Sequence, residues 1–209
     1  FYSIDPRALP TEPAWEIGKE MANNVIEQFI ADEGHYPESV GIILWATSNM
    51  RNHGTCIAEF LYLMGLKPVW QPGSHRVTGV EVIPITELKR PRIDVTGRIS
   101  GLFRDSLPAS VTWLDEAADI IAKLDEPEDM NFVRKHVLEE AEELEKEGLS
   151  KEEAWREASY RIFGDPPGCF GAGVGALLEG KNWQTVDDIA AVYTRWGGHA
   201  YGKGSEGRY

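Results

Sequence analysis

The chain has 209 residues, with 34 Asp and Glu against 21 Lys and Arg, so its formal net charge is -13. This acid excess argues against nucleic acid or an anionic membrane as the main partner, because both need a basic protein surface. No apolar run approaches the roughly 20 residues that span a bilayer. The N-terminus also lacks a signal-peptide pattern, so we expect a cytoplasmic protein with no membrane span.

The first 127 residues alternate between helical and strand-like patterns, which predicts a doubly wound α/β layer with a mostly parallel sheet. The run from Ser39 is short, apolar and β-branched, which is typical of a strand buried on both faces. Thr11 is a candidate N-cap for the first helix, and Gly65 is placed to end the second. In chain order we expect a helix at 11–34, a strand at 39–47, a polar loop at 48–54, a helix at 57–64, strands at 67–70, 80–85 and 92–100, and a helix from Pro108.

Residues 128–209 are expected to form a mainly helical extension of that layer. A long charged helix is predicted to start behind a cap at Asp125. Ser150 and Glu153 have the spacing of a capping box, and TVDD at Thr185 repeats the pattern. The glycine-rich loop GDPPGCFGAGVG interrupts these helices.

Standard catalytic and nucleotide-binding motifs are absent from the sequence. It contains no GxxxxGK[ST], HExxH or GxSxG, so it should not bind ATP through a Walker A loop. The GAGVG at Gly171 lacks the spacing of a dinucleotide loop and does not follow a strand, which favours a plain turn. Cys56 and Cys169 are too few for a disulfide framework or a closed zinc site, and we expect no resident metal.

Charged side chains occur at two places that could carry chemistry. ISGLFRD resembles a buried strand leading into Arg104 and Asp105, although these two could equally form a structural ion pair. In NFVRKH, Arg134 and His136 belong to a polar cluster within about two helical turns, which could equally be a solvated face. His53 follows an apparent parallel strand, and ligands of open α/β sheets bind beyond the carboxyl ends of such strands.

Four long strings carry a resemblance to a known family: GIILWATSNMRNHGTCIAEFLYLMGLKPVW, ITELKRPRIDVTGRISGLFRD, LDEAADIIAKLDEPEDMNFVRKH and RIFGDPPGCFGAGVGALLEGKNW. Together they resemble the large subunit shared by cobaltochelatase of the CobN type and magnesium chelatase of the H type, over Phe1 to Tyr209. FYSIDPRALPT, FGAGVGALLEG and WGGHAYG are more similar to the cobalt branch. Because members of that family are several times longer, the resemblance implies a fragment from the carboxyl-terminal half of such a subunit.

The resemblance implies an enzyme of the ligase class that inserts a divalent metal into a tetrapyrrole. The metal would be cobalt, inserted into a hydrogenobyrinate diamide in cobalamin biosynthesis, or alternatively magnesium, inserted into protoporphyrin. In this family the large subunit holds the tetrapyrrole, while AAA+ ATPase and integrin-I-like subunits use the ATP. The HGTHGxLE segment of the full subunit is absent from this sequence, so the fragment alone is expected to be inactive.

Metal insertion defines the residue types that a site would need. A neutral His or a carboxylate would remove the protons of the ring nitrogens. Arginine would bind the peripheral carboxylates of the tetrapyrrole through two parallel hydrogen bonds. The predicted set is His136, His53 and Glu59 as catalytic residues, and Arg92, Arg104 and Arg134 as substrate-binding residues.

Three hypotheses for the role of the chain follow. The first makes it one wall of a tetrapyrrole cleft. The second makes it a docking surface for the ATPase subunits, whose basic face would meet the acidic helices between Glu139 and Glu153. The third, an independent small-molecule enzyme, rests on the fold class alone.

Overall fold

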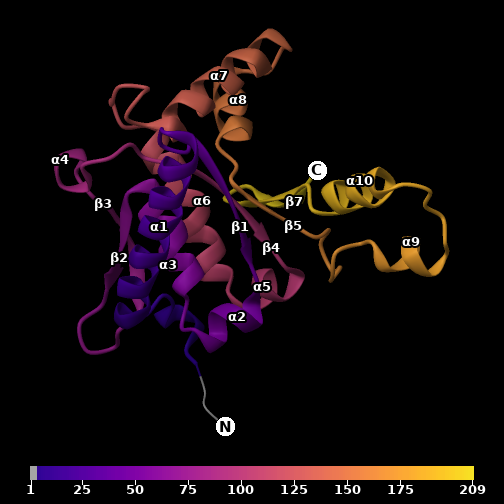
Figure 1. Cartoon of the computed structure of the whole chain (residues 1–209), viewed down its shortest axis with the longest axis horizontal. Helices are drawn as coiled ribbons and strands as arrows, with labels where there is room; N and C mark the ends of the chain where they lie inside the picture. The colour runs from indigo at the N-terminus through magenta and orange to yellow at the C-terminus, as the bar shows by residue number, and fades with distance from the viewer. Residues whose placement is uncertain (1–3) are drawn as a thin grey trace.

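A five-stranded sheet in the order β1-β4-β5-β6-β7 organises the fold (Figure 1). The computed structural model describes residues 4–209, so the first three residues of FYSIDPRALPT lie outside it. β1, β4 and β5 run parallel, while β6 and β7 add an antiparallel edge. The mixed α/β fold with a mostly parallel sheet is therefore confirmed. The strands are β1 (Ser39–Leu44), β4 (Asp94–Ile99), β5 (Ile162–Gly164), β6 (His199–Gly202) and β7 (Ser205–Arg208).

The helices begin and end where local sequence signals place them. Thr11 caps the first helix with its side chain, and Gly34 ends that helix in a left-handed conformation. Gly65 ends α3 in the same way, and capping boxes are present at Ser150 and Thr185. The helices of the described residues are η1 (Pro6–Ala8), α1 (Glu12–Glu33), α2 (Ala46–Arg51), α3 (Thr55–Met64), α4 (Ile85–Leu88), α5 (Gly101–Ser106), α6 (Pro108–Ala122), α7 (Phe132–Lys146), α8 (Lys151–Ala158), α9 (Gly175–Glu179) and α10 (Val186–Trp196).

The hydrophobic core lies between the sheet and helices α3 and α6, which pack against the strands and against each other. α1 covers α3 so closely that a side chain at Gly18 would collide with Ala58. Along β1, Ile42 and Leu44 are buried, whereas Ile43 between them is 50% exposed. The expectation of a strand buried on both faces is therefore wrong, because helices of the described chain cover only one face of β1.

Two segments of the first half fold differently from the sequence expectation. Residues 46–51 form helix α2, where the sequence predicts the end of a strand at 47 and the start of a polar loop at 48. β2 (Leu66–Trp70) and β3 (Val77–Val82) pair antiparallel as a separate two-stranded sheet. The connection between these two strands is too short for the crossover that a parallel pair would need.

Helices α5 and α7 also start at residues that the sequence did not predict. Arg104 lies on helix α5 and not at the end of a strand, because Ser100 caps that helix by accepting a hydrogen bond from a backbone N–H. α7 begins at Phe132 and not behind Asp125, because the Asn131 side chain provides the cap. Residues between α6 and α7 therefore form a turn.

The last third of the chain contributes strands as well as helices. β5, β6 and β7 each have only three or four residues, which is too short for a recognisable alternation. β5 pairs with β4, so the sheet includes strands from 1–127 and from 128–209. The division of the chain into these two parts stays a prediction.

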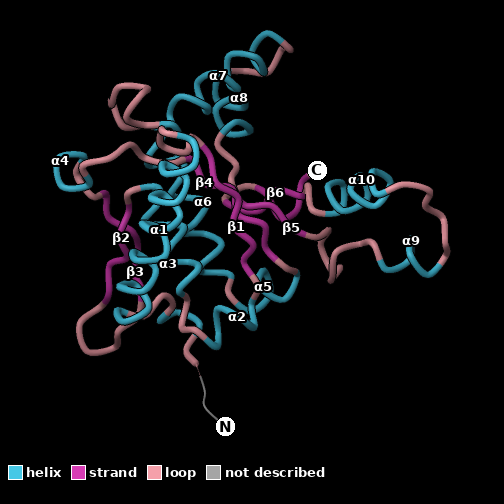
Figure 2. The backbone as a smooth tube through the Cα atoms, in the orientation of Figure 1, coloured by secondary structure: helices cyan, strands magenta, loops and turns pink. Residues whose placement is uncertain are grey.

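The segment between β5 and β6 carries α9 and α10, which lie to one side of the body of the fold (Figures 1 and 2). Every residue of these two helices is exposed or half-buried. Within residues 4–209, none of the helices combines the length and the apolar character that a membrane crossing requires.

Candidate functional site

The two ends of the parallel strands differ in what surrounds them. β1 leads into α2 and β4 leads into α5, and these two helices contact each other. We call this side the carboxyl edge, comprising residues 45–54 and 100–108. The amino edge comprises residues 38–39 and 92–94 with the first turns of α7, which contact β4. Ligands of open α/β sheets bind at the carboxyl edge.

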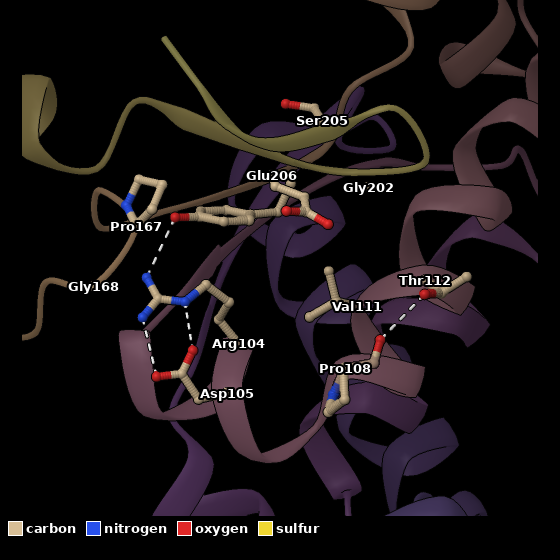
Figure 3. A pocket seen from close by; sticks show the side chains of 11 residues that line it. Arg104, Asp105, Pro108, Val111, Thr112, Pro167, Gly168, Gly202, Ser205 and Glu206 are labelled. Atoms are coloured by element: carbon tan, nitrogen blue, oxygen red, sulfur yellow. Dashed lines mark hydrogen bonds and ion pairs between the residues drawn. The ribbon is translucent and has the colours of Figure 1, made fainter.

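A cavity of about 410 Å³ lies at the carboxyl edge (Figure 3). Its walls come from α5, the first turns of α6, the loop after β5 and the β6–β7 hairpin. Arg104 is the basic residue of this lining, among apolar, aromatic and acidic neighbours. The lining consists of Arg104, Asp105, Pro108, Val111, Thr112, Pro167, Gly168, Tyr201, Gly202, Ser205 and Glu206.

The Arg104 guanidinium is held on two sides. Its Nε and Nη2 donate to the two oxygens of Asp105 at 2.7 and 3.1 Å. Its Nη1 donates to the carbonyl oxygen of Pro166 at 3.0 Å and to the hydroxyl of Tyr201 at 3.3 Å. The pairing with Asp105 has the parallel two-bond geometry with which arginine binds any carboxylate. Figure 3 shows this pair at the cavity wall.

Asp165 fixes the wall on the other side of Arg104. Its buried carboxylate accepts hydrogen bonds from Arg98 Nη2 and from the backbone N–H of Gly101, both at 3.1 Å. Its backbone carbonyl accepts the hydroxyl of Tyr201. The loop after β5, the start of α5 and strand β6 are therefore tied together around the arginine.

The charges of the cavity follow from these contacts. Hydrogen bonding to Asp105 raises the pKa of Arg104, and the same bonds lower the pKa of Asp105. Burial raises the pKa of the Tyr201 hydroxyl, which keeps it a neutral donor. Arg104 therefore stays charged and paired with Asp105, beside the apolar and aromatic surfaces of Pro167 and Tyr201.

At the amino edge, His136 belongs to an ion-pair network. Its Nδ1 lies 2.8 Å from Asp94 Oδ2, and its Nε2 lies 3.4 Å from Glu38 Oε2. Arg161 binds the same Asp94 carboxylate through Nε at 2.7 Å and Nη2 at 3.0 Å. Hydrogen bonding to Asp94 raises the pKa of His136, which favours the protonated ring, and a protonated ring has no free nitrogen to accept another proton.

Arg92 and Arg134 are engaged with the protein near the same edge. Arg92 is 0% exposed, and all five of its N–H groups are directed at Glu126 or at backbone carbonyls such as that of Gly65. Arg134 donates to the carbonyl of Ala122 at 3.2 Å. These bonds give both arginines a role in holding the turn between α6 and α7.

His53 and Glu59 lie at the start of α3, but in different surroundings. His53 is exposed, has a left-handed φ of 61°, and accepts a hydrogen bond from the Thr11 N–H with its carbonyl. Glu59 is 8% exposed on the side of α3 that α1 covers, and burial raises its pKa.

The six predicted site residues therefore do not form one cluster. Arg104 and His53 lie at the carboxyl edge, whereas Glu59 lies within the helical layer. The other three, at or beside the amino edge, are Arg92, Arg134 and His136. Within residues 4–209, no three His, Cys, Asp or Glu side chains gather closely enough to hold a metal ion.

Sequence reasoning did not identify two residues that shape the cavity, Tyr201 and Asp165. They lie 97 and 61 positions from Arg104, and only the pairing of β4, β5 and β6 brings the three together. No local pattern marks either residue, although both lie in strings that carry the family resemblance, WGGHAYG and RIFGDPPGCF.

Proteins named as chelatase subunits have similar sequences, and one of their solved structures has a similar fold. A model of the CobN/Magnesium Chelatase family matches residues 1–209. Aerobic cobaltochelatase subunit CobN of Sinorhizobium sp is 45% identical over 208 residues, covering 100% of this chain and 16% of that protein. Chloroplastic magnesium-chelatase subunit ChlH of Oryza sativa subsp. indica is 37% identical over 193 residues, covering 92% of this chain and 13% of that protein.

Among solved structures, the catalytic subunit of cobaltochelatase from Mycobacterium tuberculosis matches with a TM-score of 0.91 and 45% identity, covering 100% of this chain and 17% of that one. The chain thus spans about a sixth of the cobaltochelatase subunits that it matches. The sequence match to CobN and the structural match to the cobaltochelatase subunit each cover 100% of this chain. The chain therefore belongs to the CobN/magnesium chelatase family of large chelatase subunits.

Proposed function

We propose that this chain forms one wall of the tetrapyrrole cleft in the large subunit of an ATP-dependent metal chelatase. The observation that carries the proposal is the Arg104 cavity, where one arginine lies among apolar and aromatic surfaces at the carboxyl edge. A tetrapyrrole has the matching chemistry, because it combines a flat apolar ring with peripheral carboxylates. Arg104 would bind one such carboxylate, and Pro167 and Tyr201 would cover the ring edge.

Cobalt insertion into a hydrogenobyrinate diamide, within cobalamin biosynthesis, is the reaction that we favour. The identity to the CobN relative, 45%, exceeds the 37% identity to the ChlH relative, which supports the cobalt branch. Magnesium insertion into protoporphyrin is the alternative. In either case the divalent metal is a substrate, and the reaction belongs to the ligase class, takes place in the cytoplasm and uses ATP on AAA+ and integrin-I-like partner subunits.

Removal of the protons from the ring nitrogens needs a base at the same edge. We assign this role to His53, because it is exposed and follows the carboxyl end of β1, the strand next to β4. His136 is a weaker candidate, since β4 separates it from Arg104 by roughly 16 Å of strand rise and its contact with Asp94 favours the protonated ring. Arg92, Arg134 and Glu59 are left out of the proposed contact surface, because protein groups surround them.

A second candidate function is docking of the ATPase subunits on α7 and α8. The hairpin of these two helices projects from the body of the fold (Figure 1), and its exposed surface carries most of the glutamates between Glu139 and Glu153. A basic partner face would bind there through screened charge attraction. Retention of the partner subunits at low salt and their release at high salt would support this function.

The proposed tetrapyrrole contact is tested by titrating the chain with hydrogenobyrinate diamide and with protoporphyrin, following their absorbance and fluorescence. Arg104→Ala is expected to weaken binding at least tenfold, because a two-bond arginine–carboxylate contact is lost. Arg7→Ala, which removes an exposed arginine near the N-terminus, is the matched control and should bind like the wild type. Equal affinity of wild type and Arg104→Ala would contradict the proposal.

A further inference from the structure

Arg104 already binds a carboxylate in this structure, and that carboxylate is the side chain of the next residue. Asp105 occupies both Nε and Nη2 of the guanidinium, at 2.7 and 3.1 Å. This is the only guanidinium edge of Arg104 that can form two parallel bonds, because Nη1 is directed at Pro166 and Tyr201. A substrate carboxylate cannot take the two-bond position while Asp105 holds it.

The two members of this ion pair differ in how firmly the fold holds them. The side chain of Arg104 is 14% exposed, whereas that of Asp105 is 48% exposed. Within the described residues, Asp105 has side-chain hydrogen bonds to Arg104 alone, while Arg104 keeps three further hydrogen bonds, to Asp165, Pro166 and Tyr201, when Asp105 leaves. Rotation of Asp105 into solvent therefore frees the guanidinium edge without releasing the guanidinium from the wall.

We propose that Asp105 is a built-in occupant of the Arg104 carboxylate site, which a peripheral carboxylate of the tetrapyrrole displaces when it binds. This inference rests on the proposed function and adds the residue that sets affinity and selectivity. A ligand edge without a carboxylate gains nothing by displacing Asp105, so the exchange selects tetrapyrroles that carry a free acid at this position.

The proposal predicts that removal of the Asp105 charge makes binding tighter. Because Asp105 is half-exposed and can be solvated when it leaves, its displacement opposes binding by a small amount. Asp105→Asn is therefore expected to lower the dissociation constant of hydrogenobyrinate diamide about two- to fivefold. The dissociation constant of the fully esterified tetrapyrrole should not change.

Glu206→Gln is the matched control, because Glu206 lines the same cavity but forms no ion pair with Arg104. It removes the same charge from the same cavity, so it separates displacement from general charge repulsion. The double variant R104A/D105N should lose the gain that Asp105→Asn gives. Thermal unfolding of each variant verifies that the fold is retained.

Unchanged or weaker binding by Asp105→Asn would overturn the proposal, as would an equal gain from Glu206→Gln.

The proposed function fails separately, when wild type and Arg104→Ala bind tetrapyrrole alike or not at all. In that case sodium propionate is the probe, and the NMR signal of the Arg104 Nε–H group is followed in wild type and Asp105→Asn. The proposal expects saturation at a lower propionate concentration in Asp105→Asn, and identical titrations would refute it.

Discussion

The two edges of the sheet use arginine–carboxylate pairs in opposite ways. At the amino edge, Arg161 and His136 share the carboxylate of Asp94, and the side chains of Arg161 and Asp94 are each 7% exposed. At the carboxyl edge, Arg104 pairs with Asp105, whose side chain is 48% exposed beside a cavity. The difference teaches that a buried, fully partnered pair is costly to break, whereas a half-exposed pair can exchange one partner for a ligand.

The largest expected effect is loss of stability at the amino edge. Arg161→Ala would leave the buried Asp94 carboxylate with His136 as its remaining charged partner. Breaking a buried ion pair in this way costs about 3–5 kcal/mol of unfolding free energy. Chemical denaturation measures the loss.

Arg104→Ala, measured in the same way, serves as the comparison for that prediction. Its partner Asp105 can be solvated, so the loss of stability should be clearly smaller than for Arg161→Ala. Similar losses in the two variants would remove the distinction between the two edges.

The next effect concerns the wall that holds Arg104. Tyr201→Phe removes the hydroxyl that bonds the Asp165 carbonyl and accepts from Arg104 Nη1. One such hydrogen bond contributes about 1 kcal/mol, so tetrapyrrole affinity should fall about fivefold. The measurement is the same absorbance titration, and Tyr209→Phe, at an exposed tyrosine, is the control.

If Tyr201→Phe binds tetrapyrrole as tightly as the wild type, the position of Arg104 does not depend on this hydroxyl. If Tyr209→Phe weakens binding by the same factor, the effect does not belong to the carboxyl edge. Either result would contradict the role that we give to the β6–β7 hairpin, which is to hold Arg104 in position through Tyr201.

The smallest effect is a pH dependence at the amino edge. The pKa of His136 is raised above its ordinary value of 6.5 by hydrogen bonding to Asp94 and, less strongly, to Glu38. Its contribution to stability is therefore fully present below pH 6.5 and is lost as the pH rises through the raised pKa. The difference in unfolding free energy between wild type and His136→Gln should therefore shrink as the pH rises through that interval.

Denaturation at several pH values measures that difference, and NMR titration of the His136 ring gives its pKa directly. A stability difference that stays constant from pH 6 to pH 9 would contradict the assignment. Tetrapyrrole binding at the carboxyl edge should not follow the His136 titration, because His136 lies at the other end of β4.

The sequence by itself determined the elements whose signals are local. Thr11 and Gly34 bound α1, and the capping boxes at Ser150 and Thr185 start α8 and α10, because a cap needs only neighbouring residues. The continuous apolar run from Ser39 likewise identified β1. Family strings identified the class of subunit without any structure.

Only the tertiary structure decided which charged residues face a cavity. Arg92, Arg104 and Arg134 look alike in sequence, but packing buries Arg92, ties Arg134 to a helix end and leaves Arg104 at an opening. The partners that decide this lie far along the chain: Tyr201 for Arg104, and Glu126 for Arg92. The accessibility of a charge depends on these distant contacts, which local sequence patterns do not encode.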